Sequence, residues 1–142
     1  PELSRGLGDV YKRQGVRTAE VSGATAVIIN VKKTHEERRT IRRAGMRATR
    51  FIPVVYATTE EILAACNRKI VVAEDVGDKA PWDADLTGDV LLVVGAENAG
   101  VSKEVLDAAD DIVRLPMPGF VPSYNLQVAV SALAIERLRQ SE

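Results

Sequence analysis

The sequence predicts an α/β fold in which a mostly parallel sheet carries helices on both faces. Short apolar segments rich in valine and isoleucine alternate along the chain with segments that carry helix start signals. The apolar segments are nearly continuous, which is typical of parallel strands that are buried on both faces. The 142 residues are enough for one domain with a sizeable core.

The first half of the chain contains two expected strands and three expected helices. Thr34 with Glu37, and Thr58 with Glu61, have the spacing of a capping box, which marks the beginning of a helix. Pro53 places its strand at an edge of the sheet, because proline cannot donate a hydrogen bond to a neighbouring strand. The expected elements are a short helix over 15–22, a strand over 24–31, a basic helix over 34–44, a strand over 51–55 and a helix over 58–66.

The second half continues the same alternation. Ser102 can cap a helix, and Glu104 in its first turn favours the helix dipole. The last helix is apolar nearly all round from Leu126 to Ile135, so we expect burial on more than one side, with a partner subunit as part of the cover. The expected elements are a strand over 69–73, an acidic loop to 89, a strand over 90–94, a helix after 102, a strand over 112–113 and a final helix over 124–139.

Composition and cysteine usage bound the class of protein. No apolar run reaches the ~20 residues that a membrane span needs. Cys66 is the only cysteine, which excludes an internal disulfide and favours a reducing, cytoplasmic location. Residues 1–14 have neither helical nor strand periodicity. We interpret 1–14 as a leader that is either non-native or disordered, and 15–142 as the single domain.

The net charge of −1 hides a strong segregation of charge along the sequence. Basic residues dominate from 32 to 50, and acidic residues dominate from 74 to 89. In the expected basic helix, arginines stand one turn apart, and such like-charge pairs weaken an isolated helix. An anionic partner would neutralise them, although a solvated helix face is the alternative. A local basic face is sufficient to bind a polyanion despite the slightly acidic total.

Two turn-rich segments near the C-terminus are candidates for a ligand site. The first follows the strand over 90–94 and contains Gly95, Glu97 and Gly100. We expect Gly95 to take the positive φ that a tight turn needs, and Gly100 to allow the close approach of backbone or ligand. Glu97 between them can accept backbone N–H groups and fix the loop. Taken alone, this spacing favours a plain structural turn.

The second segment, 115–125, has an unusually rigid backbone. It contains Pro116, Pro118, Gly119 and Pro122. Such a composition predicts an irregular loop, and a rigid loop at the carboxyl edge of a parallel sheet is a preorganised ligand cradle. Ser123 and Asn125 stand at the start of the final helix. They could cap this helix or bind a substrate, and the residues alone leave both interpretations open.

Together, these segments resemble the last two signature motifs of the SpoU/TrmH family of RNA ribose 2′-O-methyltransferases. The residues that carry the resemblance are 91–102 for one motif and 115–125 for the other. In addition, 15–20 resembles the second half of an earlier family motif, whose key arginine corresponds to Arg17. The resemblance implies a C-terminal deep trefoil knot that holds S-adenosylmethionine. It also implies methyl transfer to a ribose 2′-hydroxyl of tRNA or rRNA, a homodimer and no metal.

The resemblance assigns roles to individual residues. It implies that the cofactor lies against Gly95, Gly100, Leu115, Met117 and Tyr124. It implies a catalytic group of Arg17, Glu97, Ser123 and Asn125. We interpret Arg17 as a phosphate anchor that stabilises developing alkoxide charge, because an arginine side chain stays protonated in proteins. Ser123 or a substrate phosphate then helps to accept the proton. The RNA is expected to contact Arg17, Arg38, Arg39, Arg42 and Arg43.

Two other classes of function stay open. A non-catalytic RNA-binding domain with the same knot is supported by Tyr11, which stands where the family motif has asparagine, and by Tyr124, which replaces the usual leucine. A generic nucleotide-binding regulatory domain would bind adenine nucleotides without preference for S-adenosylmethionine. His35 lies beside a capping box and is interpreted as a surface residue. Trp82 is expected to pack at a loop or dimer contact rather than on a base.

Overall fold

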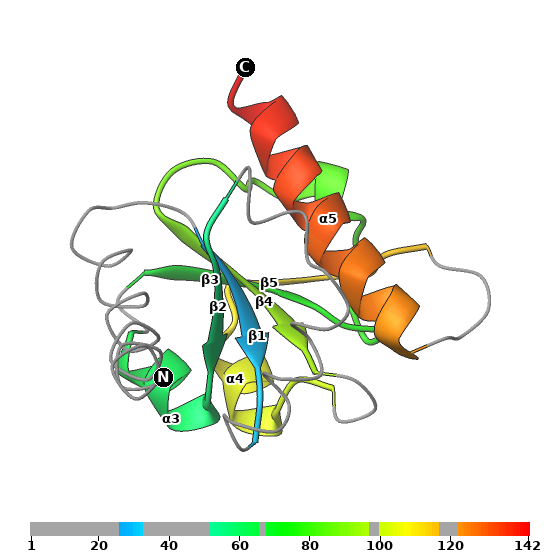
Figure 1. Cartoon of the computed structure of the whole chain (residues 1–142). Helices are drawn as coiled ribbons and strands as arrows, with labels where there is room; N and C mark the ends of the chain where they lie inside the picture. Colours follow the sequence, from blue (N-terminus) through cyan, green and yellow to red (C-terminus); the bar gives the residue numbers. More distant parts are fainter. Residues whose placement is uncertain (1–25, 33–51, 66–67, 97–99, 117–121) are drawn as a thin grey trace, which may run out of the picture.

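The computed structural model describes residues 26–32, 52–65, 68–96, 100–116 and 122–142, with the backbone alone for 122–125. In this part of the chain, five parallel strands form one sheet in the order β2-β1-β4-β3-β5 (Figure 1). Because every neighbouring pair is parallel, the carboxyl ends of all these strands lie at the same edge of the sheet. The strands are β1 (Ala26–Asn30), β2 (Val54–Ala57), β3 (Lys69–Ala73), β4 (Val90–Gly95) and β5 (Asp111–Val113).

Helices cover both faces of the sheet (Figure 1). Helix α5 (Pro122–Gln140) packs on one face, whereas α3 (Thr59–Ala64) and α4 (Lys103–Ala108) pack on the other. Successive residues of a strand point to opposite faces. In β1, Ile29 belongs to the core cluster under α5, and Ile28 belongs to the cluster under α3 and α4. Both side chains are fully buried, which explains why this strand is continuously apolar. The predicted parallel α/β fold with helices on both faces is confirmed.

Most of the predicted element positions are confirmed. Strand β3 has the predicted bounds, and β2 is an edge strand as Pro53 indicated. Thr58 caps α3 in a complete capping box, since its hydroxyl accepts the Glu61 N–H and the Glu61 carboxylate accepts the Thr58 N–H at 3.0 Å. Ser102 caps α4 by accepting the Val105 N–H. Each cap satisfies a backbone N–H that the helix itself cannot pair.

Two boundaries differ from the prediction for reasons of hydrogen bonding. Strand β2 starts at Val54 rather than at 51, because Pro53 has no N–H to donate, although its carbonyl accepts the Val27 N–H at 2.9 Å. Helix α3 ends at Ala64 rather than at 66. Its last turn is tighter, because the Ala65 N–H donates to the Ile62 carbonyl three residues earlier.

Two further differences involve prolines. Helix α5 begins at Pro122 rather than at 124, because the first helical position needs no N–H donor and suits proline. The acidic segment expected as a loop contains a short 3₁₀ helix, η2 (Pro81–Asp83), which also begins with a proline. The expected leader over 1–14 and the helices expected over 15–22 and 34–44 lie outside the described residues.

One side of α5 is buried within the chain itself. The buried residues of this helix are Leu126, Ala129, Val130, Leu133 and Ala134. In contrast, Ile135 is 60% exposed and Leu138 is 48% exposed. The burial of α5 on a second side therefore stays a prediction that depends on a partner. Trp82 is also largely exposed in the single chain. None of the described helices is long and apolar enough to cross a membrane.

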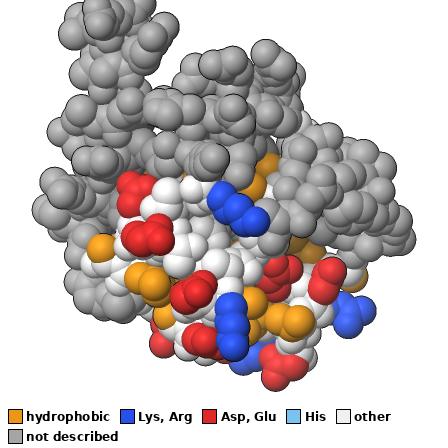
Figure 2. Space-filling model, turned by 90° about the horizontal axis from the view of Figure 1, so that it is seen from below, with side chains coloured by type: hydrophobic (Ala, Val, Ile, Leu, Met, Phe, Trp, Pro, Cys, Tyr) orange, Lys and Arg blue, Asp and Glu red, His pale blue; other side chains and the backbone are white. Residues whose placement is uncertain are grey.

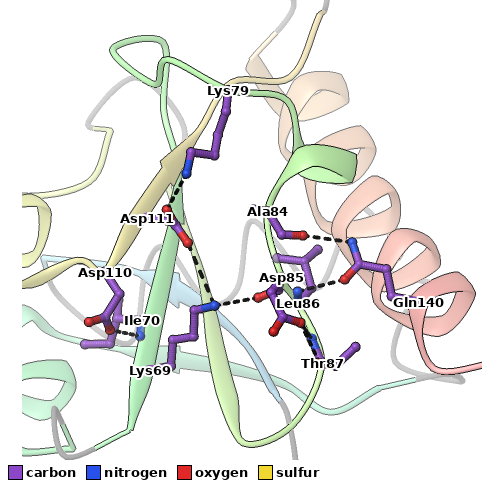
Figure 3. A network of polar contacts seen from close by, with 10 residues as sticks. All are labelled: Lys69, Ile70, Lys79, Ala84, Asp85, Leu86, Thr87, Asp110, Asp111 and Gln140. Atoms are coloured by element: carbon purple, nitrogen blue, oxygen red, sulfur yellow. Dashed lines mark hydrogen bonds and ion pairs between the residues drawn. The ribbon is translucent and has the colours of Figure 1, made fainter.

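The amino edge of the sheet carries a network of polar contacts (Figure 3). The side chain of Gln140, near the end of α5, accepts the Leu86 N–H at 2.8 Å and donates to the Ala84 carbonyl at 3.0 Å. Lys69 donates to the Asp85 carbonyl at 2.8 Å. The hydroxyl and the N–H of Thr87 donate to the Asp85 carboxylate at 2.5 and 2.9 Å. The Gln140 contacts fasten the segment before β4 to the end of α5, and the Lys69 contact fastens it to β3.

Candidate functional site

The two described ends of the loop after β4 meet at the carboxyl edge of the sheet, with Gly95 and Ala96 on one side and Gly100 on the other. The Gly100 N–H donates to the Ala96 carbonyl at 3.3 Å, so these two residues pair as a small antiparallel bridge. A Cβ atom at Gly95 would collide with the Gly100 backbone. Gly100 has a φ of +68°, which favours glycine. The prediction of a positive φ at Gly95 is wrong, because Gly100 takes it, whereas the predicted close approach at Gly100 is confirmed by the Glu74 carboxylate.

Asn30 holds the next part of this loop from the end of β1. Its side chain is almost completely buried, at 5% exposed for the whole residue. The side-chain oxygen accepts the Ser102 N–H at 3.0 Å, and the side-chain amide donates to the Ala57 carbonyl at 3.3 Å. The Asn30 backbone carbonyl accepts the Ala96 N–H at 3.1 Å. A single residue therefore joins the ends of β1 and β2 to both described ends of the loop after β4.

A second hydrogen bond joins the beginnings of the two helices on this edge. The Thr59 hydroxyl, at the start of α3, donates to the Ser102 hydroxyl at 2.9 Å. The Ser102 hydroxyl is also the acceptor that caps α4. Because the two helices share this contact, the start of α4 has a fixed position relative to the ends of β1 and β2.

Glu74 is the corresponding polar residue after β3. Its carboxylate oxygen Oε1 accepts the Val101 N–H at 2.6 Å, and its own N–H donates to the Val113 carbonyl at 2.9 Å. In the sheet order, β3 lies between β4 and β5. Glu74 therefore contacts the backbone that follows β4 on one side and the end of β5 on the other.

The second motif begins directly after β5. Leu115 is partly buried and packs against the core cluster under α5. Just before it, the Arg114 N–H donates to the Lys79 carbonyl at 2.8 Å. A Cβ at Gly77 would lie 2.5 Å from the Val113 carbonyl carbon, so a side chain there would push this backbone away. The segment from 77 to 79 thus supports the end of β5 from outside.

The structure brings some of the predicted site residues together, whereas others lie outside the described residues. Gly95 and Gly100 are in direct contact, and Leu115 lies at the same edge, after the end of β5. Ser123, Tyr124 and Asn125 lie in the first turn of α5. Because α5 begins at Pro122, neither Ser123 nor Asn125 stands at its N-cap position. The predicted site residues outside the described part are Arg17, Arg38, Arg39, Arg42, Arg43, Glu97 and Met117.

Sequence reasoning missed the two polar residues that hold the loop. It gave the task of accepting backbone N–H groups to Glu97, whereas Asn30 and Glu74 perform it for the described residues Ser102 and Val101. A signal was present in the sequence, since each residue ends or directly follows a buried apolar strand. In a parallel sheet this is the edge where ligands bind.

The described part of the face in Figure 2 does not show the segregated charge of the sequence. Seen from below, acidic, basic and apolar side chains are interspersed over the described part of this face (Figure 2). The basic stretch predicted to bind RNA runs from 32 to 50. All of it except residue 32 lies outside the described residues. Among the described residues there is no cluster of three or more histidine, cysteine, aspartate or glutamate side chains able to hold a metal ion.

The fold and the loop geometry together define a class of protein. This is a parallel α/β domain whose candidate ligand site lies at the carboxyl edge of the sheet, at the loops that follow β4 and β5. The sequence profile of the SpoU rRNA methylase family matches residues 14–135. The chain therefore belongs to this family, which confirms the membership predicted from the motifs.

Individual relatives agree with this assignment. The 23S rRNA (guanosine-2′-O-)-methyltransferase RlmB of Pseudomonas aeruginosa is 35% identical over 129 residues, which cover 88% of this chain and 52% of the relative. RlmB of Escherichia coli is 28% identical over 129 residues, with 88% of this chain and 53% of the relative covered. The chain thus spans about half the length of these curated relatives.

Solved structures have the same fold. The SpoU methyltransferase AviRb from Streptomyces viridochromogenes, crystallised in complex with the cofactor AdoMet, has a TM-score of 0.62 and 20% identity. That match covers 84% of this chain and 58% of AviRb. The TrmH/SpoU tRNA modifying enzyme of A. aeolicus has a TM-score of 0.56 and 22% identity, with 92% of this chain and 84% of that one covered. At these identities the likeness establishes the fold.

Proposed function

We propose that this chain is the catalytic domain of an S-adenosylmethionine-dependent methyltransferase that acts on a ribose 2′-hydroxyl of rRNA or tRNA. The observation that carries the proposal is the close approach of Gly95 and Ala96 to Gly100 at the carboxyl edge of β4, in a chain that belongs to the SpoU rRNA methylase family. The names of the RlmB relatives favour a guanosine of 23S rRNA as the substrate.

The residues at the carboxyl edge fit this cofactor. Gly95 and Gly100 bring backbone close together without side chains, and Leu115 offers an apolar contact at the same edge. We assign cofactor binding to these residues together with Met117 and Tyr124, within a C-terminal trefoil knot. AviRb, which has the same fold, binds AdoMet in its crystal structure. When bound, S-adenosylmethionine supplies an electrophilic methyl group on a sulfonium sulfur.

The remaining residues handle the RNA and its proton. Arg17 binds a phosphate of the substrate and stabilises the negative charge that develops on the attacking 2′-oxygen. Ser123 helps to accept the proton of the hydroxyl, and Asn125 orients the ribose from the same turn of α5. Glu97 holds the loop after β4. Much of the rate then comes from positioning the hydroxyl in line with the methyl group.

The RNA and a second copy of the chain are the proposed partners. The basic stretch that contains Arg38, Arg39, Arg42 and Arg43 binds phosphates, which would make RNA affinity strongly dependent on salt. The exposed side chains of Ile135 and Leu138 on α5 are apolar surface that a homodimer could cover. In this dimer, Arg17 of one subunit would act at the cofactor of the other.

Transfer of a radiolabelled methyl group tests the proposed reaction. The wild-type chain is incubated with S-adenosylmethionine and with 23S rRNA or tRNA transcripts, and 2′-O-methylation is mapped. We expect Arg17→Ala to lower turnover by about 10²–10³ while affinity for S-adenosylhomocysteine stays nearly intact. Arg139→Ala, which removes an exposed arginine at the far end of α5, is the matched control and should leave turnover unchanged.

Each outcome of this experiment has a distinct meaning. Loss of cofactor affinity in Arg17→Ala would count against its catalytic role. A wild-type chain that binds S-adenosylhomocysteine and RNA but methylates neither transcript would favour the non-catalytic RNA-binding domain, to which Tyr11 and Tyr124 point.

A further inference from the structure

Glu74 connects the two loops that carry the family motifs. Through its backbone N–H it donates to the Val113 carbonyl, directly before the second motif, at 2.9 Å. Through its side chain it accepts the Val101 N–H, in the first motif, at 2.6 Å. Strands β4 and β5 are not neighbours in the sheet, because β3 lies between them. Glu74 therefore bridges two loops whose strands do not touch.

The carboxylate lies directly against the backbone of the loop. A Cβ atom placed on Gly100 would lie 2.6 Å from Oε1 of Glu74. Gly100 thus gives room to the carboxylate as well as adopting the positive φ that the turn requires. Any side chain at position 100 would push Glu74 away from the Val101 N–H.

The contact is of a strong kind. A hydrogen bond from a backbone N–H to an ionised carboxylate is roughly twice as strong as one between neutral groups. It is partly buried, which limits the competition from water. The second carboxylate oxygen accepts the N–H of Asp75 at 3.2 Å, and this contact fixes the orientation of the group.

We propose that Glu74 is a positioning residue for cofactor binding. It holds the return of the loop after β4 in the conformation that receives S-adenosylmethionine, and it acts through the backbone of Gly100 and Val101. This inference rests on the function proposed above. It adds a residue outside the recognised motifs, from the end of β3, to the machinery of the site.

The test compares three variants of the full chain by calorimetric titration with S-adenosylhomocysteine. Glu74→Ala removes the acceptor, and we expect affinity to fall by about tenfold or more, the equivalent of one charge-assisted hydrogen bond. Glu74→Gln keeps an acceptor for Val101 and should retain most of the affinity. Asp75→Ala removes the neighbouring exposed carboxylate and should bind like the wild type.

Amide hydrogen exchange separates this proposal from the proposed function. In Glu74→Ala, the Val101 amide should exchange faster, while the amides of β1 keep their protection. Unchanged affinity in a folded Glu74→Ala chain would overturn the positioning role. If the wild type does not bind S-adenosylhomocysteine, the proposed cofactor and the positioning role both fail. Faster exchange of the Val101 amide in Glu74→Ala would then show that Glu74 only anchors the loop structurally. If Glu74→Ala does not fold, Glu74→Asp takes its place, because its shorter side chain draws the carboxylate back from the Val101 N–H, and wild-type affinity in that variant would overturn the proposal.

Discussion

The two edges of the sheet use the same kind of contact for different purposes. At the carboxyl edge, Asn30 and Glu74 accept backbone N–H groups from the loop after β4, in partly buried positions. At the amino edge, Gln140 and Asp85 accept backbone N–H groups from Leu86 and Thr87. The first set fixes a loop with a family motif. In the second set, Gln140 fastens the end of α5, and Asp85 closes a local turn before β4. Side-chain contacts to backbone N–H groups therefore hold the candidate site at the carboxyl edge and stabilise the fold at the amino edge.

The largest expected difference between the edges comes from their glycines. Gly95→Ala at the carboxyl edge should destabilise the chain by about 1–3 kcal/mol, because the new Cβ collides with the Gly100 backbone. It should also abolish measurable binding of S-adenosylhomocysteine, since the loop must move. Calorimetric titration and urea unfolding measure the two effects.

Gly88 provides the control at the amino edge. It has a φ of +78°, and nothing lies within 4 Å of its Cβ position. Gly88→Ala should therefore cost about 1–2 kcal/mol of backbone strain and leave cofactor affinity unchanged. A Gly95→Ala chain that binds S-adenosylhomocysteine normally would show that the tight turn is not part of the site.

The next largest effect concerns the side chains that anchor backbone. Asn30→Ala leaves the partly buried Ser102 N–H without its acceptor, so the free energy of unfolding should fall by about 1–3 kcal/mol. Gln140→Ala removes two contacts that water can replace at a less buried site, and we expect about 0.5–1.5 kcal/mol. Urea unfolding of both variants gives these values. A larger loss for Gln140→Ala would reverse the proposed ranking of the two edges.

The smallest effect is a pH dependence confined to the amino edge. The pKa of Asp85 lies below its usual value, first because the Thr87 hydroxyl donates to it and then because the Thr87 N–H does. Thr87→Ala should raise this pKa, as an NMR titration of the carboxyl group would show. A lowered pKa in the folded state stabilises the fold above the unfolded pKa, and this contribution is lost as pH falls. The difference in the free energy of unfolding between Thr87→Ala and wild type should therefore be largest at neutral pH and should decrease in acid.

The same titration sharpens the comparison of the edges. Because Asp85 lies far from the loop after β4 along the strands, affinity for S-adenosylhomocysteine should be equal in Thr87→Ala and wild type. A changed affinity would mean that the amino edge is coupled to the site.

The sequence predicted the parts of the fold that depend on local patterns. Apolar runs located β1, β3 and β4, and the capping box located the start of α3, because strand burial and helix capping are visible in neighbouring residues. Exact boundaries failed where proline chemistry decided them, as at Pro53 and Pro122. These errors amount to two or three residues and leave the topology intact.

The candidate site was predictable in its loops but not in its anchors. Gly95 and Gly100 stood out as a motif, yet which one needs a positive φ depends on the three-dimensional course of the turn. The contact of Asn30 with Ser102 spans 72 residues, and that of Glu74 with Val101 spans 27. Such partners are set by strand order, which no local pattern reveals.

The central claim, that the carboxyl edge binds S-adenosylmethionine, is tested most directly by calorimetric titration of the wild-type chain with S-adenosylhomocysteine, with ATP as the control. We predict saturable binding of S-adenosylhomocysteine and none of ATP at the same concentrations. Equal binding of both ligands would indicate a general adenine nucleotide site. Binding of neither ligand by a folded chain would contradict the assignment of this edge as a cofactor site.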